Sequence, residues 1–180
     1  MRKCWHVNLS LILTCILMLE RTVHIVLCYS SCDDLTPSDG EEPQNDPSPF
    51  IITTETQTLT SCEQLKVSLE NGHDEHLKSF IVQARSTDTQ EVVGTFFQYS
   101  VISVLLLKYL DCGNGTKNTV THKNGFFWKE KVVDLIWAPD EDFTGDIYFV
   151  ASFVYNVTAF WTNVTSQLVS VNNKGLLIVY

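Results

Sequence analysis

The chain lacks the sequence motifs by which the common classes of enzyme are recognised. Its 180 residues contain no G-x-S-x-G nucleophile motif, no glycine-rich phosphate loop and no H-E-x-x-H zinc motif. Serine, histidine and aspartate are present, but a catalytic triad is defined by its geometry and not by sequence positions. The sequence therefore predicts a protein that is not an enzyme and needs no cofactor.

Positive charge is scarce. The chain has 12 lysine and arginine residues against 21 aspartate and glutamate residues, which gives a net charge of −9 at pH 7. Removal of the leader described next takes away three basic residues and one acidic residue, so the net charge falls to −11. Such a surface repels the phosphates of nucleic acids and anionic lipid head groups. We therefore expect no nucleic-acid partner and no direct lipid binding.

No apolar run is long enough to span a membrane as a helix. The run at residues 7–19 follows two basic residues, and its roughly 13 residues fall short of the about 20 that a spanning helix needs. A charged start and a short apolar stretch are typical of a secretory signal peptide. We assign residues 1–30 to this signal peptide, with cleavage after Ser30, and expect a secreted, extracellular protein. The alternative, an uncleaved anchor, would place Glu20 and Arg21 in or beside the bilayer, which is unfavourable.

Three glycosylation sequons agree with secretion. Asn114, Asn156 and Asn163 each stand two residues before a threonine, as the acceptor pattern requires, whereas Asn8 lies within the leader. Three sequons behind a leader indicate passage through the secretory pathway. We expect N-linked glycans at these three asparagines.

The cysteines become odd in number once the leader is removed. Three of the six lie in residues 1–30, and Cys32, Cys62 and Cys112 remain. One thiol is then unpaired or joins another chain, and spacing leaves all three pairings open. A bridge from Cys32 to Cys112 would close a loop of about 80 residues and stabilise the fold by about 4 to 5 kcal/mol in the chain-entropy model. Because neither C-x-x-C nor Cys/His zinc spacing occurs, we expect no metal at these cysteines.

Amphipathic helical periodicity is absent, and short alternating segments take its place. Phe80, Val82 and Ala84 show the two-residue period of a strand, and a polar turn then separates them from a second extended segment. Similar segments lie at residues 50–54, 65–69, 79–97, 101–110, 119–122, 131–137, 145–155 and 165–171. About eight or nine short strands at even spacing predict an all-β fold, an antiparallel β-sandwich of two sheets.

Two segments depart from this pattern. Residues 31–49 are rich in Asp, Glu and Pro, so we expect an exposed acidic arm before a sandwich at residues 50–171 and a C-terminal tail at residues 172–180. Residues 101–110 form the most apolar run outside the leader. This run predicts a strand buried on both faces or a short packed helix.

The large aromatic residues are expected mainly in the core. Trp137, Phe149, Phe153 and Phe160 fall on or beside the alternating segments. Trp161 lies near a strand end between two sequons and is the one aromatic residue placed to face a ligand. Glycans on those sequons would crowd this end of the sandwich and disfavour a large protein partner there.

Histidine offers two candidate sites. Residues 73–76 (His-Asp-Glu-His) hold two imidazoles and two carboxylates, but in a connection they could not all reach one ion without an unusual loop. We expect solvated charge there and no metal site. His122 lies at a strand end, where we expect a structural role.

The mature chain contains a series of short motifs, in this order: Cys32-Asp-Asp-Leu-Thr-Pro, Ser48-Pro-Phe, Gln83-Ala-Arg, Gly94-Thr-Phe, Cys112, Val120-Thr-His, Trp137-Ala-Pro, Gly145-x-Ile-x-Phe-x-Ala-Ser and Phe160-Trp-x-x-Val-x-Ser. Together they resemble the reeler domain, which is found in reelin and spondin-type matrix proteins, in ferric-chelate reductase-like membrane proteins and as the whole of small secreted insect defense proteins. The resemblance implies an immunoglobulin-like sandwich and a bridge between Cys32 and Cys112. Cys62 falls outside the family pattern.

The resemblance implies two alternative functions. A leader and a lone domain favour a secreted, non-catalytic, antimicrobial protein of innate immunity that binds a microbial surface or an extracellular glycoconjugate. The alternative is a matrix or adhesion module, or a shortened relative of the ferric-chelate reductases whose redox chemistry would belong to missing haem-binding helices. The sequence leaves the ligand and the oligomeric state open.

Overall fold

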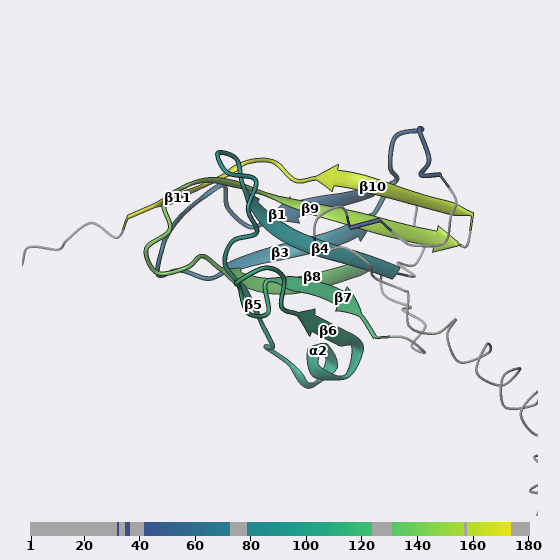
Figure 1. The fold of residues 1–180 in the computed structure, drawn as a ribbon. Coiled ribbons are helices and arrows are strands. Elements are labelled where there is room, and N and C mark those ends of the chain that lie inside the picture. Colours follow the sequence, from purple (N-terminus) through teal and green to yellow (C-terminus); the bar gives the residue numbers. More distant parts are fainter. Residues whose placement is uncertain are drawn as a thin grey trace, which may run out of the picture.

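The described part of the computed structural model contains eleven strands, which pack as two facing sheets (Figure 1). The described residues are Cys32, Leu35 and Thr36, together with residues 42–72, 79–123, 131–156 and 158–173. Successive side chains of a strand point to opposite faces, so each strand contributes one apolar row to the space between the sheets. The expected all-β sandwich is confirmed.

The smaller sheet, sheet A, has four antiparallel strands in the order β1-β3-β8-β5. They are β1 (Phe50–Thr54), β3 (Leu65–Asn71), β8 (Val132–Ala138) and β5 (Thr95–Phe97). In β3, Leu65, Val67 and Leu69 are buried and the residues between them face outward. This alternation made the strand recognisable in the sequence.

The larger sheet, sheet B, has the order β2-β11-β9-β4-β7-β6, and a further strand, β10, pairs with β9. These strands are β2 (Thr58–Thr60), β11 (Val169–Asn172), β9 (Gly145–Asn156), β4 (Ser79–Ser86), β7 (Thr119–His122), β6 (Leu107–Leu110) and β10 (Ala159–Thr165). The long strand β9 pairs with β4 along one side and with β10 and β11 in succession along the other.

Sheet B corrects two details of the sequence prediction. The described strands number eleven, not eight or nine, because β2 and β10 were not anticipated. β2 is also parallel to β11, so the sandwich is not purely antiparallel. β2 has three residues, of which Leu59 alone is buried, and this is too short for alternation to show.

Aromatic rings fill the centre of the sandwich. Phe50 stacks on Phe153 with ring centroids 4.8 Å apart, and Trp137 meets Phe149 edge to face at 5.4 Å. Phe160 is buried as well. The predicted core positions of Trp137, Phe149, Phe153 and Phe160 are therefore confirmed.

The apolar run at residues 101–110 divides into a helix, α2 (Val101–Leu106), and strand β6. The Oγ of Ser100 accepts from the backbone N–H of Ser103 at 3.1 Å, and the Oγ of Ser103 accepts from the backbone N–H of Ser100 at 3.1 Å. This capping box starts the helix, so a strand buried on both faces is wrong for the first half of the run. No described helix is long and apolar enough to cross a membrane.

Much of the described acidic arm is exposed, as the sequence suggested, namely Glu42 and residues 44–47, but the arm is also held against the sandwich. Leu35 is buried against Ile81 and Val150, which belong to a small cluster separate from the main core. The backbone N–H of Gln44 donates to the carbonyl of Phe160 in β10 at 2.9 Å. Among the described strands β10 pairs with β9 alone, so its other edge is open, and the arm supplies a partner there for the carbonyl of Phe160.

Candidate functional site

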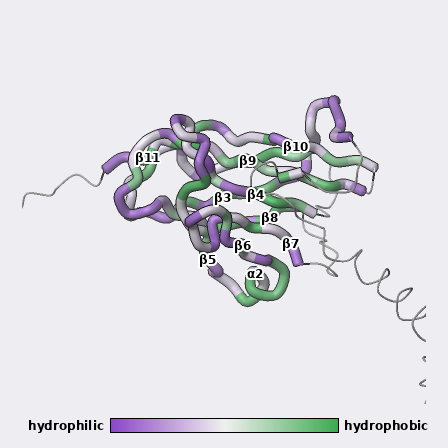
Figure 2. Tube along the Cα trace, in the orientation of Figure 1, coloured by the Kyte–Doolittle hydropathy of each residue, from purple (hydrophilic) through white to green (hydrophobic). Residues whose placement is uncertain are grey.

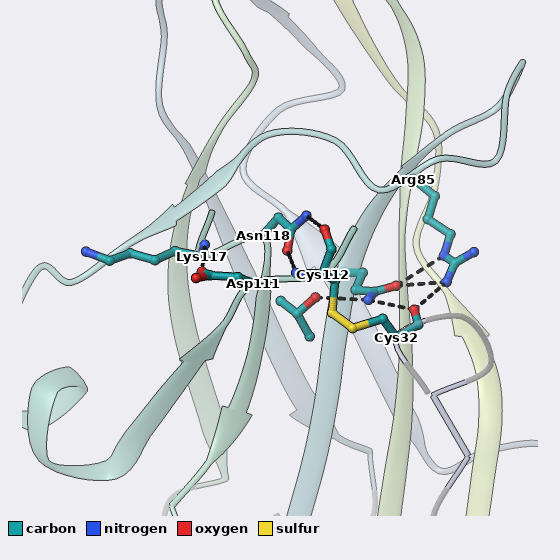
Figure 3. Close-up of a disulfide and its surroundings, with 8 residues drawn as sticks. Cys32, Arg85, Asp111, Cys112, Lys117 and Asn118 are labelled. Carbon is teal, nitrogen blue, oxygen red and sulfur yellow. Dashed lines mark hydrogen bonds between the residues drawn. A yellow bond between two sulfur atoms is a disulfide. The ribbon is translucent and has the colours of Figure 1, made fainter. Parts of the chain in front are cut away.

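A disulfide joins the arm to the loop between β6 and β7 (Figure 3). Cys32 and Cys112 are separated by 80 residues in sequence, and their Cα atoms lie 5.5 Å apart. This is the pairing that the resemblance implied, among the three that spacing left open. Cys62 has a free, exposed thiol in the connection between β2 and β3.

Asn118 holds the loop around Cys112 in shape. Its side-chain Oδ1 accepts from the backbone N–H of Cys112 at 2.8 Å, and its Nδ2 donates to the carbonyl of Cys112 at 2.7 Å. The amide thus pairs with both backbone groups of one residue, as a strand neighbour would. Because Asn118 is buried, these bonds fix the loop firmly.

Gln83 and Arg85 of β4 hold the other half of the disulfide (Figure 3). The Gln83 amide donates to the carbonyl of Cys32 at 2.9 Å and to Thr119 Oγ1 at 2.9 Å. The Arg85 guanidinium donates to the same Cys32 carbonyl at 3.1 Å and to Gln83 Oε1 at 2.9 Å. The start of the arm, at Cys32, is therefore fixed by hydrogen bonds from side chains as well as by the disulfide.

A groove with a volume of about 570 Å³ lies beside the disulfide. Its lining includes Arg85, Gln90, Glu91, Asn114 and Asp140. Asp140 also accepts from the backbone N–H of Gly94 at 3.0 Å, which ties the far wall to the start of β5. The groove thus contains one guanidinium and two carboxylates, and a disulfide and hydrogen bonds hold its lining segments in place.

Polar recognition is the chemistry that this groove can perform. The guanidinium donates hydrogen bonds, the carboxylates accept them and the amides do both, which suits a ligand rich in hydroxyl groups. The described residues contain no cluster of three or more histidine, cysteine or acidic side chains that could hold a metal ion. Residues 73–76, the weighed metal candidate, lie outside the described residues.

A model of the reeler domain family matches residues 30–176. The chain belongs to the reeler family. "Putative defense protein 3" of Antheraea mylitta is 32% identical over 143 residues, which cover 79% of this chain and 82% of that protein. "Putative ferric-chelate reductase 1" of Danio rerio is 27% identical, and the match covers 83% of this chain but only 25% of that protein.

Solved structures show the same reeler fold. The human F-spondin reeler domain (fragment 1) superposes with a TM-score of 0.57 at 13% identity, covering 73% of this chain and 95% of the other. The Reelin-N domain of F-spondin superposes with a TM-score of 0.56 at 13% identity, covering 74% of this chain and 93% of that domain. At this identity the likeness concerns the fold alone.

The three sequons of the reeler domain lie on its surface. Asn114, Asn156 and Asn163 are all exposed. Asn114 lines the groove, so a glycan there would stand at the groove and limit what can enter. Asn156 ends β9, and Asn163 lies at an irregularity of β10 with a positive φ of 55°, a conformation that asparagine tolerates. Their glycosylation stays a prediction.

Trp161, the residue expected to face a ligand, is placed away from the groove lining. Its indole N–H donates to the carbonyl of Asp46 in the arm at 3.1 Å, and its ring meets Phe50 edge to face at 5.6 Å. The side chain is half-buried against the core. Trp161 therefore helps to join the arm, β1 and β10, and only part of its ring is accessible.

His122 lies at the end of β7, as expected, and is half-buried. Its Nδ1 is 3.2 Å from Ser79 Oγ and 3.4 Å from Thr121 Oγ1. A serine beside a histidine is the first pair of a catalytic triad, but no hydrogen bond among the described residues joins this histidine to a carboxylate. The contacts are those of a strand end packed against its neighbour.

His122 makes the stability of the reeler domain dependent on pH. Burial lowers the pKa of His122 below 6.5, and a hydrogen bond with Phe80 opposes this only in part. The unfolded chain therefore takes up the proton first, so the contribution of the neutral ring is complete above pH 6.5 and is lost as pH falls below that value. We expect the free energy of unfolding to fall less between about pH 7 and pH 5 in His122→Gln than in the wild type. Urea denaturation at several pH values measures this, and identical pH profiles would contradict the assignment.

Sequence reasoning missed most residues of the groove. Of its lining residues, Arg85 was noted only as part of a family motif, and Gln90, Glu91 and Asp140 gave no signal of binding. These side chains come from β4, from the segment after it and from the segment after β8. Their roles depend on contacts between distant parts of the chain.

Proposed function

We propose that this chain is a secreted, non-catalytic protein of innate defense that binds microbial surface or extracellular glycoconjugates. The observation that carries the proposal is the match to "Putative defense protein 3", which covers 79% of this chain and 82% of that relative. The similarity to this relative extends over most of both chains. We therefore assign the proposed function to the reeler domain, residues 30–176.

The groove beside the disulfide supplies a chemistry for such binding. Glu91 is exposed at its wall and offers a carboxylate to ligand hydroxyls, while Arg85 offers a cation beside it. The disulfide and its hydrogen bonds hold these groups in place before a ligand arrives, which reduces the entropy lost on binding. The disulfide, the sequons and the leader all support an oxidising, extracellular compartment.

Retention on microbial cells tests the proposal. The full chain is expressed in eukaryotic cells, and the protein collected from the medium is incubated with bacterial cells, fungal cells and isolated wall polysaccharides. We expect retention above that of an acidic control protein of similar size, with weak dependence on salt because the net charge after cleavage is −11. Failure to reach the medium would contradict secretion, and retention no greater than the control would contradict the binding role.

Two matched variants assign any binding to the groove. Glu91→Gln removes one of the two exposed carboxylates of the groove, and we expect about tenfold weaker retention because hydrogen bonds to charged groups contribute about 1.5 to 3 kcal/mol. Glu55→Gln alters an exposed glutamate outside the groove and should have no effect. Both substitutions are made in a Thr116→Ala background. This change removes the sequon at Asn114, and so any glycan at the groove, but keeps the asparagine itself. If the two substitutions changed retention equally, the groove would not be the binding site.

The second candidate is a module of a larger matrix or reductase-type protein. It is favoured by the match to "Putative ferric-chelate reductase 1", of which this domain accounts for only 25%. In that case the domain would be a spacer, and redox chemistry would belong to other parts of the longer protein. A longer transcript from the same locus, continuing into membrane-spanning segments after residue 171, would favour this candidate over the first.

A further inference from the structure

Exposed apolar side chains gather at and before α2. Figure 2 shows α2 as a hydrophobic stretch of the chain. Eight large hydrophobic side chains are exposed in the described part of the chain, and five of them fall within residues 97–105. Their exposed fractions range from 39% to 75%. We call this set the α2 surface; it consists of Phe97, Tyr99, Val101, Val104 and Leu105. A cluster of exposed apolar side chains marks an interaction site more often than apolar side chains scattered singly over the surface do.

The α2 surface is firmly built. Val101, Val104 and Leu105 have the i, i+3, i+4 spacing that places side chains on one face of a helix. The helix is capped at its start by Ser100, and at its end the Lys123 ammonium donates to the carbonyl of Val104 at 2.6 Å. The exposed face is therefore presented in a fixed conformation.

Charge around the α2 surface has the opposite sign to the rest of the protein. Residues 97–123 contain three lysines and one aspartate, whereas the whole chain has 12 basic and 21 acidic residues. Lys108 is exposed just past the helix, and Lys123 lies at the helix end. On sheet A, the carbonyl of Asp134 accepts from the Tyr99 hydroxyl at 2.8 Å, and the Asp134 carboxylate forms an ion pair with Lys66 at 2.8 Å, which offsets its charge.

We propose that the α2 surface docks on an anionic phospholipid bilayer. Val101, Val104 and Leu105 enter the boundary between head groups and acyl chains, and Lys108 and Lys123 face the lipid phosphates. Carboxylates elsewhere on the protein oppose this only weakly, because charges more than about 8 Å away are largely screened at physiological salt. The expectation that a net charge of −11 prevents lipid binding treats the charge as uniform, and it is not. The inference stands independently of the groove and of the function proposed above.

A lipid surface fits these side chains better than a protein does. A second copy bound through the same face would bring two lysine-bordered patches together, since a two-fold interface pairs the same surface patch of both subunits. A stable protein interface buries about 800 Å² on each partner, more than five side chains around a six-residue helix provide. A bilayer needs only a small apolar insertion and a cationic border.

Vesicle co-sedimentation tests the proposal. The secreted protein is mixed with vesicles of phosphatidylcholine containing about a third phosphatidylserine, or with vesicles of phosphatidylcholine alone. We expect partition into the anionic vesicles at low salt, at least about tenfold weaker partition into the neutral ones, and a further loss as salt is raised. Lys108→Glu should remove part of the salt-dependent binding.

Leu105→Asp and its control decide whether the α2 surface is responsible. Leu105 and Leu168 are both 55% exposed, but Leu168 lies in the connection before β11 and outside the α2 surface. We expect Leu105→Asp to weaken partition at least about tenfold and Leu168→Asp to leave it unchanged, with both variants folded by circular dichroism. Partition of Leu105→Asp equal to wild type would overturn the proposal.

Two further results would overturn it. A dimer in sedimentation velocity that Leu105→Asp dissociates would assign the α2 surface to a second copy. Nuclear Overhauser contacts between Leu105 methyls and an aromatic ring of residues 126–128, which lie outside the described residues, would show that the same chain covers this face. Absence of both, together with anionic-vesicle binding, supports the lipid assignment.

Discussion

Replacing both Cys32 and Cys112 with alanine should lower the free energy of unfolding by about 4 to 5 kcal/mol. The bridge closes a loop of 80 residues, so its loss gives the unfolded chain much more conformational freedom. Small domains are stable by only about 5 to 15 kcal/mol, so the variant should be largely unfolded well below the melting temperature of the wild type. Urea denaturation of the deglycosylated proteins at pH 7 measures the difference.

Cys62→Ala is the matched control for the disulfide. Its thiol is exposed and unpaired, so the substitution should change the free energy of unfolding by less than about 0.5 kcal/mol. A loss below about 1 kcal/mol in the double variant, or an equal loss in the control, would contradict the structural role of the bridge. The double variant keeps the backbone carbonyl of residue 32, so the hydrogen bonds from Gln83 and Arg85 remain to hold this point of the arm.

Trp137→Ala should lower the free energy of unfolding by about 3 to 5 kcal/mol, the usual range for a fully buried aromatic residue. Trp137 is fully buried, meets Phe149 edge to face, and donates its indole N–H to the carbonyl of Val93 at 3.2 Å. Gly94 passes so close to the indole that an added Cβ would collide with it, which indicates that the site is tightly packed. Tightly packed neighbours cannot move in to fill the cavity that the indole leaves, so the expected loss of unfolding free energy is large.

Trp161→Ala serves as the comparison, because the same residue type is half-buried there. Its loss should be clearly smaller than that of Trp137→Ala, since less apolar area leaves water at that position. Denaturant midpoints of the two variants, measured with equal m-values, give the ranking. The opposite ranking would show that the core does not centre on Trp137 and Phe149.

Strand prediction succeeded where one face of a strand is buried. β1 matches the predicted segment at residues 50–54, and β3 contains the predicted segment at residues 65–69, because buried and exposed side chains alternate in both. It failed at β10, where the pairing with β9 is irregular around Asn163 and the alternation is interrupted. The prediction of a buried strand at residues 101–110 was wrong in its first half for a different reason. Apolar composition does not reveal whether a side chain contacts the core or the solvent.

The sequence by itself determined the all-β sandwich and its aromatic core. Period-two alternation is a property of neighbouring residues, and burial of one face converts it directly into strands. Spacing left the partner of Cys32 open, and the family resemblance implied the bridge to Cys112 that the structure contains. Only the tertiary structure decided which side chains line the groove and which apolar residues remain exposed on α2. Those outcomes depend on packing between residues as far as 80 positions apart, and no local pattern records such contacts.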